Sequence, residues 1–255
     1  MRLVCVISSL GAGGAERVMS QLGNYFANCD WKIRLITISG TGSDFFYLKK
    51  GIDRIALNSQ KNSKNFFFAV KNNFQRMFNL RREVLKFSPN LVLVFGARTN
   101  ILTILSLRGT DIPVVISERT DPFSLNIGFP WHILRTWAYK KSTKIIAQTD
   151  VMRDLIKKSW QLNNVVSISN PISNDIPVLE NDFTKRKSIL LCVGRLSSEK
   201  GHDLLLDSWA SIKNEFPNWR LKLIGNGPER ERLKKRSQNL KISRSIEFVK
   251  KMEDS

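Results

Sequence analysis

The 255-residue sequence predicts an α/β fold built on parallel sheets, and three observations carry that prediction. Short apolar runs alternate with longer amphipathic segments, as in strand–helix–strand units. The composition, with 42% hydrophobic and 25% charged residues, is that of a globular protein. Several apolar runs end in glycine-rich turns that precede a helical pattern, and such turns are typical of the ligand-binding edge of a parallel sheet.

Residues 1–170 are predicted to form a complete domain. The amphipathic stretches between its strands are of roughly 10–20 residues, which is long enough for crossover helices. The first of these helices is expected over residues 15–27. Seven apolar runs are predicted to be strands: residues 3–8, 32–38, 52–57, 91–95, 114–117, 144–147 and 165–168.

A linker is predicted at residues 171–187, because the stretch from Asn170 to Arg186 is rich in Pro, Asn and Asp and has no periodicity. Strand–helix alternation then restarts in a second domain, residues 188–255. A doubly wound nucleotide-binding domain usually has about five or six strands, so the second domain is expected to be incomplete. The elements expected there are strands at 188–193, 220–224 and 246–249 and helices at 202–215 and 228–240.

The net charge is strongly positive, since 41 Lys and Arg residues face 22 Asp and Glu residues, which gives +19. Such a balance favours an anionic partner: nucleic acid, a membrane surface or a phosphorylated substrate. The chain has no run of about 18 apolar residues, so no transmembrane helix is predicted. We expect a cytoplasmic protein, with the inner face of the cytoplasmic membrane as an alternative location. The three cysteines are too few and too scattered for a disulfide framework or a Cys-based zinc site.

A glycine-rich turn, Gly11 to Gly14, follows the first predicted strand. Free N–H groups at a helix start favour phosphate, so this turn is a candidate phosphate loop. The spacing matches neither the dinucleotide-binding motif, because Glu16 stands in place of its third glycine, nor the P-loop. A tight turn of purely structural use therefore stays open.

Two more glycine turns follow strands of the second domain. The sequence GRLSSEKG places Arg195 and Lys200 on a loop after the strand at 188–193, where an Arg fork and a Lys charge suit a diphosphate. A solvated basic loop without a ligand is the alternative. The sequence GNGPE places Gly225 and Gly227 after the next strand, where a base or ribose could lie against the backbone.

Taken together, these motifs resemble family 4 glycosyltransferases of the GT-B fold, in order over the whole chain. The resemblance rests on GGAE, Asn170-Pro171, GRLSSEKG and LIGNGPE. It implies two Rossmann-like domains and retaining transfer of a sugar from a nucleotide-sugar, here expected to be a UDP-sugar, without a metal or other cofactor. It implies that Arg195 and Lys200 hold the donor diphosphate. It also implies that Gly13 and Gly14 approach the donor phosphates and the acceptor in the cleft, while Gly225 and Gly227 lie on the nucleoside side.

Two departures from the family pattern are apparent. The E-x7-E motif that contacts the donor is not found, so this chain is expected to be a truncated copy with weak or no activity. In place of a His after the fifth strand stands the sequence SERTDP, which resembles a subset of bacterial polysaccharide transferases. Glu118 is therefore the candidate catalytic residue, and its alternative is a carboxylate paired with Arg119 or Arg98.

A basic segment, residues 61–86, has phenylalanines at helical spacing among cations. It predicts either a crossover helix or a helix that lies on an anionic membrane, which would suit a polyprenyl-diphosphate-linked or other glycan acceptor in bacterial surface-polysaccharide assembly. A non-catalytic domain that binds acceptor lipid or a partner transferase is the alternative function. Specific nucleic-acid binding is disfavoured, because no recognition motif accompanies the charge.

Overall fold

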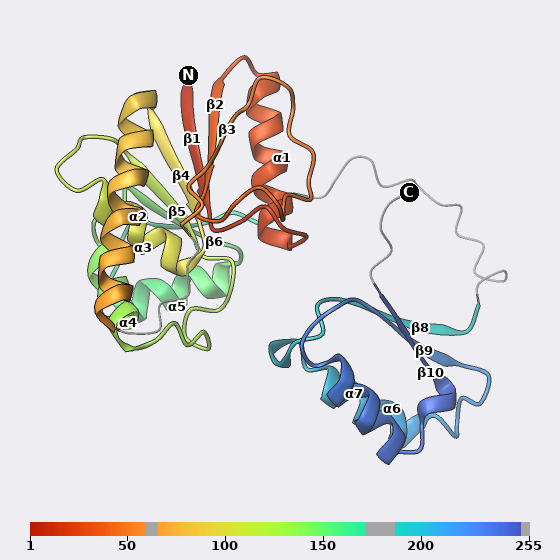
Figure 1. Cartoon of the computed structure of the whole chain (residues 1–255). Coiled ribbons are helices and arrows are strands. Elements are labelled where there is room, and N and C mark those ends of the chain that lie inside the picture. Colours follow the sequence, from red (N-terminus) through yellow and green to blue (C-terminus); the bar gives the residue numbers. More distant parts are fainter. Residues whose placement is uncertain (60–65, 172–186, 251–255) are drawn as a thin grey trace. The chain divides into compact units, whose positions relative to one another are not determined.

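The computed structural model describes residues 1–59, 66–171 and 187–250, and the chain divides into two compact units, Met1–Asn174 and Asp175–Ser255 (Figure 1). Each unit is built on a parallel β-sheet with packed helices, so the predicted α/β class is confirmed. The predicted linker at 171–187 lies, except for its two end residues, outside the described residues.

The first unit has a seven-stranded parallel sheet in the order β3-β2-β1-β4-β5-β6-β7. The order reverses between β1 and β4, so the carboxyl ends of these two strands flank the crevice in which open parallel sheets bind ligands. The strands are β1 (Arg2–Ile7), β2 (Lys32–Thr37), β3 (Asp53–Ala56), β4 (Leu91–Phe95), β5 (Val114–Ser117), β6 (Lys144–Ala147) and β7 (Val165–Ser167).

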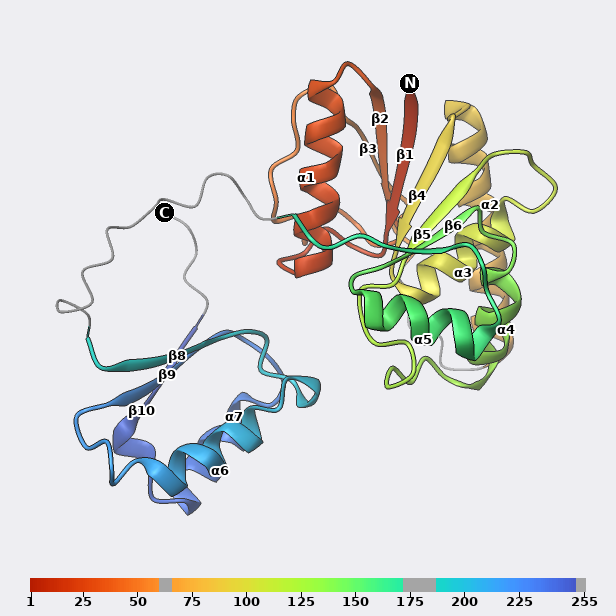
Figure 2. The same cartoon turned by 180° about the vertical axis from the view of Figure 1, so that it is seen from behind.

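Helices cover both faces of this sheet (Figures 1 and 2). Helix α1 packs Val18 and Met19 on one face, whereas the other helices contribute Leu80, Ile101 and Ile156 to the core on the opposite face. This arrangement explains why most of the strands read as continuous apolar runs. The helices are α1 (Gly14–Asn28), α2 (Phe66–Phe87), α3 (Ala97–Ser106), α4 (Phe129–Tyr139) and α5 (Asp150–Trp160).

The described part of the second unit has a three-stranded parallel sheet in the order β10-β9-β8. Both of its helices lie on the same side of the strands (Figures 1 and 2) and enclose a core around Leu221, Leu223 and Trp209. On β8, Leu191 and Val193 are 55% and 69% exposed. The elements are β8 (Ile189–Val193), the 3-10 turn η2 (Ser198–Lys200), α6 (His202–Ile212), β9 (Arg220–Ile224), α7 (Arg230–Asn239), the 3-10 turn η3 (Ser243–Ser245) and β10 (Ile246–Val249).

The predicted strands agree with the observed ones to within one residue at each end, because polar residues, Gly or Pro bound each apolar run. The basic segment forms one continuous helix, α2, from Phe66 onward, and residues 61–65 of that segment lie outside the described residues. Helix α2 ends before Ser88, whose φ of 50° leaves the helical region ahead of Pro89.

Candidate functional site

The glycine-rich turn lies at the carboxyl end of β1, as predicted, and Gly13 is the N-cap of α1. The carboxylate of Glu16 folds back against this turn, where a Cβ on Gly13 would overlap it, and Ser9 Oγ donates to Glu16 Oε1 at 3.4 Å. A negative charge in the first turn of a helix is favoured by the helix dipole. The chain's own carboxylate thus lies where phosphate was predicted, and contact of Gly13 and Gly14 with a ligand stays a prediction.

Glu118 follows the last residue of β5 and is only 3% exposed. Its carboxylate accepts a hydrogen bond from the Tyr139 hydroxyl, which itself accepts one from Asn100 Nδ2 at 3.1 Å. Burial raises the pKa of Glu118 to about 7, although the Tyr139 hydrogen bond and the charge of Arg135 lower it. The side chain therefore points into the protein, toward α3 and α4.

The cation beside Glu118 is Arg135 of α4, which is 1% exposed. Its Nη1 donates to the carbonyl of Pro122 at 2.6 Å, and its guanidinium lies 5.7 Å from the Trp160 ring centroid. The alternative pairing of Glu118 with Arg119 or Arg98 was wrong, since α4 supplies both the hydrogen bond and the charge. A contact between Glu118 and a sugar stays a prediction that this inward orientation does not favour.

The side chain of Arg119, the residue after Glu118, points away from that of Glu118. Its guanidinium carbon lies 4.4 Å from the ring centroid of Phe95, the last residue of β4, and its Nη2 donates to Asn170 Oδ1. Gln148, just past β6, donates to the same oxygen at 3.0 Å. The carboxyl ends of β4 to β7 thus meet in one polar cluster. Sequence reasoning treated Arg119 only as a partner of Glu118, although its place just after a strand was a signal.

In the second unit, Arg195 and Lys200 lie on the loop at the carboxyl end of β8, as predicted. The Arg195 side chain is 70% exposed and pairs with Glu199 at 3.1 Å. A hydrogen bond from Ser197 at 2.6 Å and the charge of Arg195 hold the pKa of Glu199 below its ordinary value. Lys200 is exposed and forms no ion pair with the described part of the chain. This loop therefore presents a cation that is available to an anion.

Close backbone packing fixes the shape of this loop. A Cβ on Gly225 would overlap the carbonyl oxygen of Gly194, and one on Gly227 would overlap that of Leu196. Hydrogen bonds join the same segments, from Leu196 N to Asn226 O at 2.9 Å and from Glu229 N to Leu196 O at 3.0 Å. The glycines of the GNG turn thus admit the chain's own backbone, which places them beside the Arg195 loop. Their contact with a nucleoside stays a prediction.

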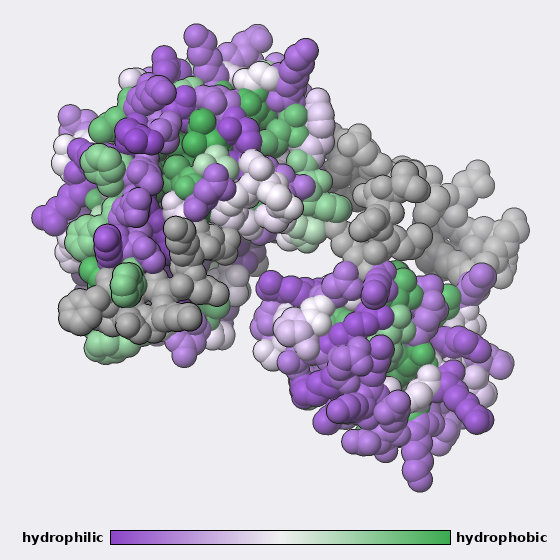
Figure 3. Space-filling view, viewed as in Figure 1, coloured by the Kyte–Doolittle hydropathy of each residue, from purple (hydrophilic) through white to green (hydrophobic). Residues whose placement is uncertain are grey.

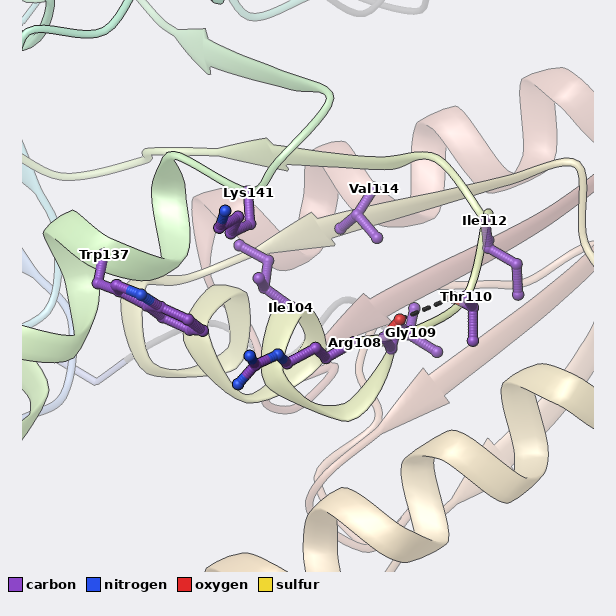
Figure 4. A pocket seen from close by; sticks show the side chains of 9 residues that line it. Ile104, Arg108, Gly109, Thr110, Ile112, Val114, Trp137 and Lys141 are labelled. Atoms are coloured by element: carbon purple, nitrogen blue, oxygen red, sulfur yellow. Dashed lines mark hydrogen bonds between the residues drawn. The ribbon is translucent and has the colours of Figure 1, made fainter.

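A pocket lies in the first unit where the strands begin, near Val114 at the amino end of β5 (Figure 4). Arg108 and Trp137 line it, with the guanidinium carbon 5.5 Å from the ring centroid, and Lys141 lies nearby. None of the residues predicted from the motifs lines this pocket, because all of them follow the carboxyl ends of strands.

In the described part of the chain, none of the helices combines the length with the hydropathy that a membrane span needs. Nor do three His, Cys, Asp or Glu side chains gather within it as a metal site requires.

Comparisons with known proteins agree with the motifs. The family model described as Glycosyltransferase Family 4 matches residues 12–175, and that described as Glycosyl transferases group 1 matches residues 179–255. An uncharacterized glycosyltransferase of Haemophilus influenzae is 29% identical over 95% of this chain and 67% of its own length. An alpha-1,4-N-acetyl-D-galactosaminyltransferase of Campylobacter jejuni, named for a PP-undecaprenol-linked glycan, is 24% identical over 100% and 69% of the two chains.

Solved structures share the fold. Sucrose-phosphate synthase from Thermosynechococcus elongatus superposes with a TM-score of 0.81 at 15% identity, over 99% of this chain and 71% of that one. The Anabaena protein HepE in complex with UDP gives a TM-score of 0.74 at 12% identity, over 99% and 70%. The chain thus spans about two thirds of the length of each of these four proteins.

Proposed function

Because this chain belongs to glycosyltransferase family 4, we propose that it moves a sugar from a UDP-sugar to a lipid-linked or polysaccharide acceptor with retention of anomeric configuration. The observation that carries the proposal is the Arg195–Lys200 loop at the carboxyl end of β8. UDP in a structural neighbour and the PP-undecaprenol-linked substrate in a relative's name support the donor and acceptor classes. The process that we assign is bacterial surface-glycan assembly.

The donor diphosphate would bind to the second unit. Lys200 offers a charge without a carboxylate partner among the described residues, and Arg195 can exchange its exposed pair with Glu199 for a phosphate at little cost. His202, which is 4% exposed, holds the loop from inside through a contact of its Nε2 with the Arg195 carbonyl at 3.0 Å. Such preorganised donors stabilise charge as it develops on a departing diphosphate.

In the proposed transfer, the bond between the sugar's anomeric carbon and the diphosphate oxygen breaks, and a bond to the acceptor oxygen forms. The departing diphosphate oxygen takes the proton of the acceptor hydroxyl, so no oxidant or reductant is needed. Fixed cations and N–H dipoles contribute more to such a step than a strong base does. We expect neither a metal ion nor another cofactor to take part.

The first unit would face an anionic membrane through α2. Phe68, Phe74 and Phe78 are 59%, 66% and 66% exposed, which is unusual for a helix that only bridges two strands. Lys71 and Arg82 are exposed on the same helix, and apolar side chains lie among hydrophilic ones over α2 in Figure 3. Phenylalanines among cations are typical of helices that lie in the headgroup region of anionic bilayers.

Helix α4 adds a second apolar row that sequence reasoning did not include. Phe129, Ile133 and Trp137 follow each other at four-residue spacing and are 78%, 58% and 39% exposed. Helices α2 and α4 both pack on α3 and share one core, so both rows belong to the same layer of the unit. We place the protein on the inner face of the cytoplasmic membrane by means of this layer.

A second candidate function is a non-catalytic domain that binds acceptor lipid, and the exposed phenylalanines of α2 favour it. We also propose that this chain on its own transfers sugar slowly, because the described sheet of the second unit has three strands, where a doubly wound nucleotide-binding domain usually has about five or six, and leaves Leu191 and Val193 exposed. Purified chain incubated with labelled UDP-sugars and polyprenyl-diphosphate-linked acceptors tests both functions. Slow transfer that persists with a chelator and is lost in Lys200→Gln supports the transferase. Saturable lipid binding without transfer supports the second function. If the chain neither transfers sugar nor binds lipid, both functions are contradicted.

A further inference from the structure

The side chains of the two residues that follow β5 point in opposite directions. Glu118 is 3% exposed and bonded to Tyr139, whereas Arg119 lies against the ring of Phe95 at the carboxyl edge of the sheet. Successive side chains of an extended segment point to opposite faces. Anchoring of Glu118 inside the protein therefore sends Arg119 to the edge where parallel sheets bind ligands.

Arg119 is held there without a carboxylate. In the described part of the chain its partners are the Phe95 ring and the neutral amide of Asn170, and its Nε atom is buried with no hydrogen-bond partner. A guanidinium carries five N–H donors and no acceptor. The buried Nε is out of reach of a ligand, but the Nη1 group donates to none of the described residues and is not among the buried atoms, so its N–H groups remain for a ligand.

The amides beside Arg119 add further donors. Asn170 Oδ1 accepts hydrogen bonds from both Arg119 and Gln148, which uses the two lone pairs of that oxygen. What remains on the Asn170 side chain is its NH2 group, and Asn170 is exposed. The nearest carboxylate in sequence, Glu118, points away into the core. The cluster is therefore rich in donors and positively charged.

We propose that Arg119 and Asn170 bind an oxyanion, namely a phosphate of a diphosphate group. Guanidinium matches phosphate through paired N–H bonds, and a second donor at its side fixes orientation. This inference rests on the proposed function, whose two substrates, the UDP-sugar and the prenyl-diphosphate-linked acceptor, both carry a diphosphate. The chemistry is shared, and the source of the phosphate is left to experiment.

The experiment is calorimetric titration of the full chain with three probes: inorganic pyrophosphate, UDP and farnesyl diphosphate. Pyrophosphate is titrated into the variant with Arg195→Gln and Lys200→Gln, so that the second unit's loop does not mask the first unit. Adding Arg119→Gln should weaken pyrophosphate binding about tenfold, the effect of losing one charge-assisted bond. Arg108→Gln, which removes an Arg from a Trp face at the opposite edge of the sheet, is the matched control and should change binding less than twofold.

The other two probes identify the source in the chain with Arg195 and Lys200 intact. A tenfold loss for farnesyl diphosphate alone assigns the acceptor, and a loss for UDP alone assigns the donor. Asn170→Ala, at an exposed position, covers the case in which Arg119→Gln does not fold, and should weaken pyrophosphate binding about threefold. Unchanged pyrophosphate binding in the folded variants, or an equal loss in Arg108→Gln, overturns the inference. Neither of these two results would contradict the proposed function, because that function depends on UDP binding through Lys200.

Discussion

The α-carbon of Gly225 faces the carbonyl oxygen of Gly194 so closely that no side chain fits between them. This contact joins the loop that carries Arg195 to the turn after β9, and the φ of Gly225, 154°, is one that L-residues rarely adopt. Two glycine motifs about thirty residues apart in the sequence thus form one rigid element. The geometry of the cationic loop depends on it.

Gly225→Ala should therefore destabilise the second unit by at least about 2 kcal/mol, through backbone strain together with steric overlap. Thermal denaturation, monitored by hydrogen exchange in peptides from this unit, measures the loss of stability. Gly194→Ala is the control, because a Cβ there meets nothing within 4 Å. Equal stability of the two variants would contradict the packing described.

Glu118→Gln should change how stability depends on pH. The folded pKa of Glu118, about 7, lies above the ordinary value of 4.5, so the folded protein binds this proton more tightly than the unfolded chain does. The resulting stabilisation is present below about pH 4.5 and is lost as the pH rises through about 7. Its size is on the order of a few kcal/mol, since one pKa unit corresponds to about 1.4 kcal/mol.

Urea denaturation of the parent and of Glu118→Gln at pH 5 and pH 8 tests this pH dependence of stability. The stability of Glu118→Gln relative to the parent should rise between the two pH values. Glu231→Gln, at an exposed carboxylate, should show no such rise. If the two variants respond alike, Glu118 does not titrate as a buried group.

The strands and the loop positions could be predicted from sequence because each depends on neighbouring residues. An apolar run that ends at Val193 and is followed by Gly194 places Arg195 at a strand end whatever the rest of the chain does. The inward direction of Glu118 could not be predicted in this way. It depends on Tyr139, 21 residues further along the chain, and on Arg135 of the same helix.

The structural reason for the glycines of the GNG turn could not be predicted from the sequence either. A turn at Gly225 and Gly227 could be recognised, but its close approach to Leu196 arises only when β8 and β9 pair. The exposed row on α4 was missed for a different reason. Apolar residues at four-residue spacing predict a buried stripe, and only the packed structure shows that Phe129 and Ile133 face outward.

Replacing Phe74 and Phe78 together by Ser should lower binding to vesicles of phosphatidylethanolamine and phosphatidylglycerol by tenfold or more. Each exposed ring would lose part of the roughly 1.5–3 kcal/mol that full burial of such a side chain provides. Vesicle co-sedimentation measures the change. Phe216→Ser, which alters an exposed ring of the second unit, is the control and should bind as the parent does. Parent-like binding of the double variant would exclude α2 from the membrane surface.

The central claim is that the loop after β8 holds a nucleoside diphosphate, and the affinity of the full chain for UDP tests it most directly. Calorimetry should show binding that weakens about tenfold in Lys200→Gln and in Arg195→Gln, because each loses a charge-assisted bond to phosphate. Lys235→Gln, at an exposed lysine on α7, should bind UDP as the parent does. Parent-like affinity in all three variants, or no UDP binding by the parent, would contradict the account.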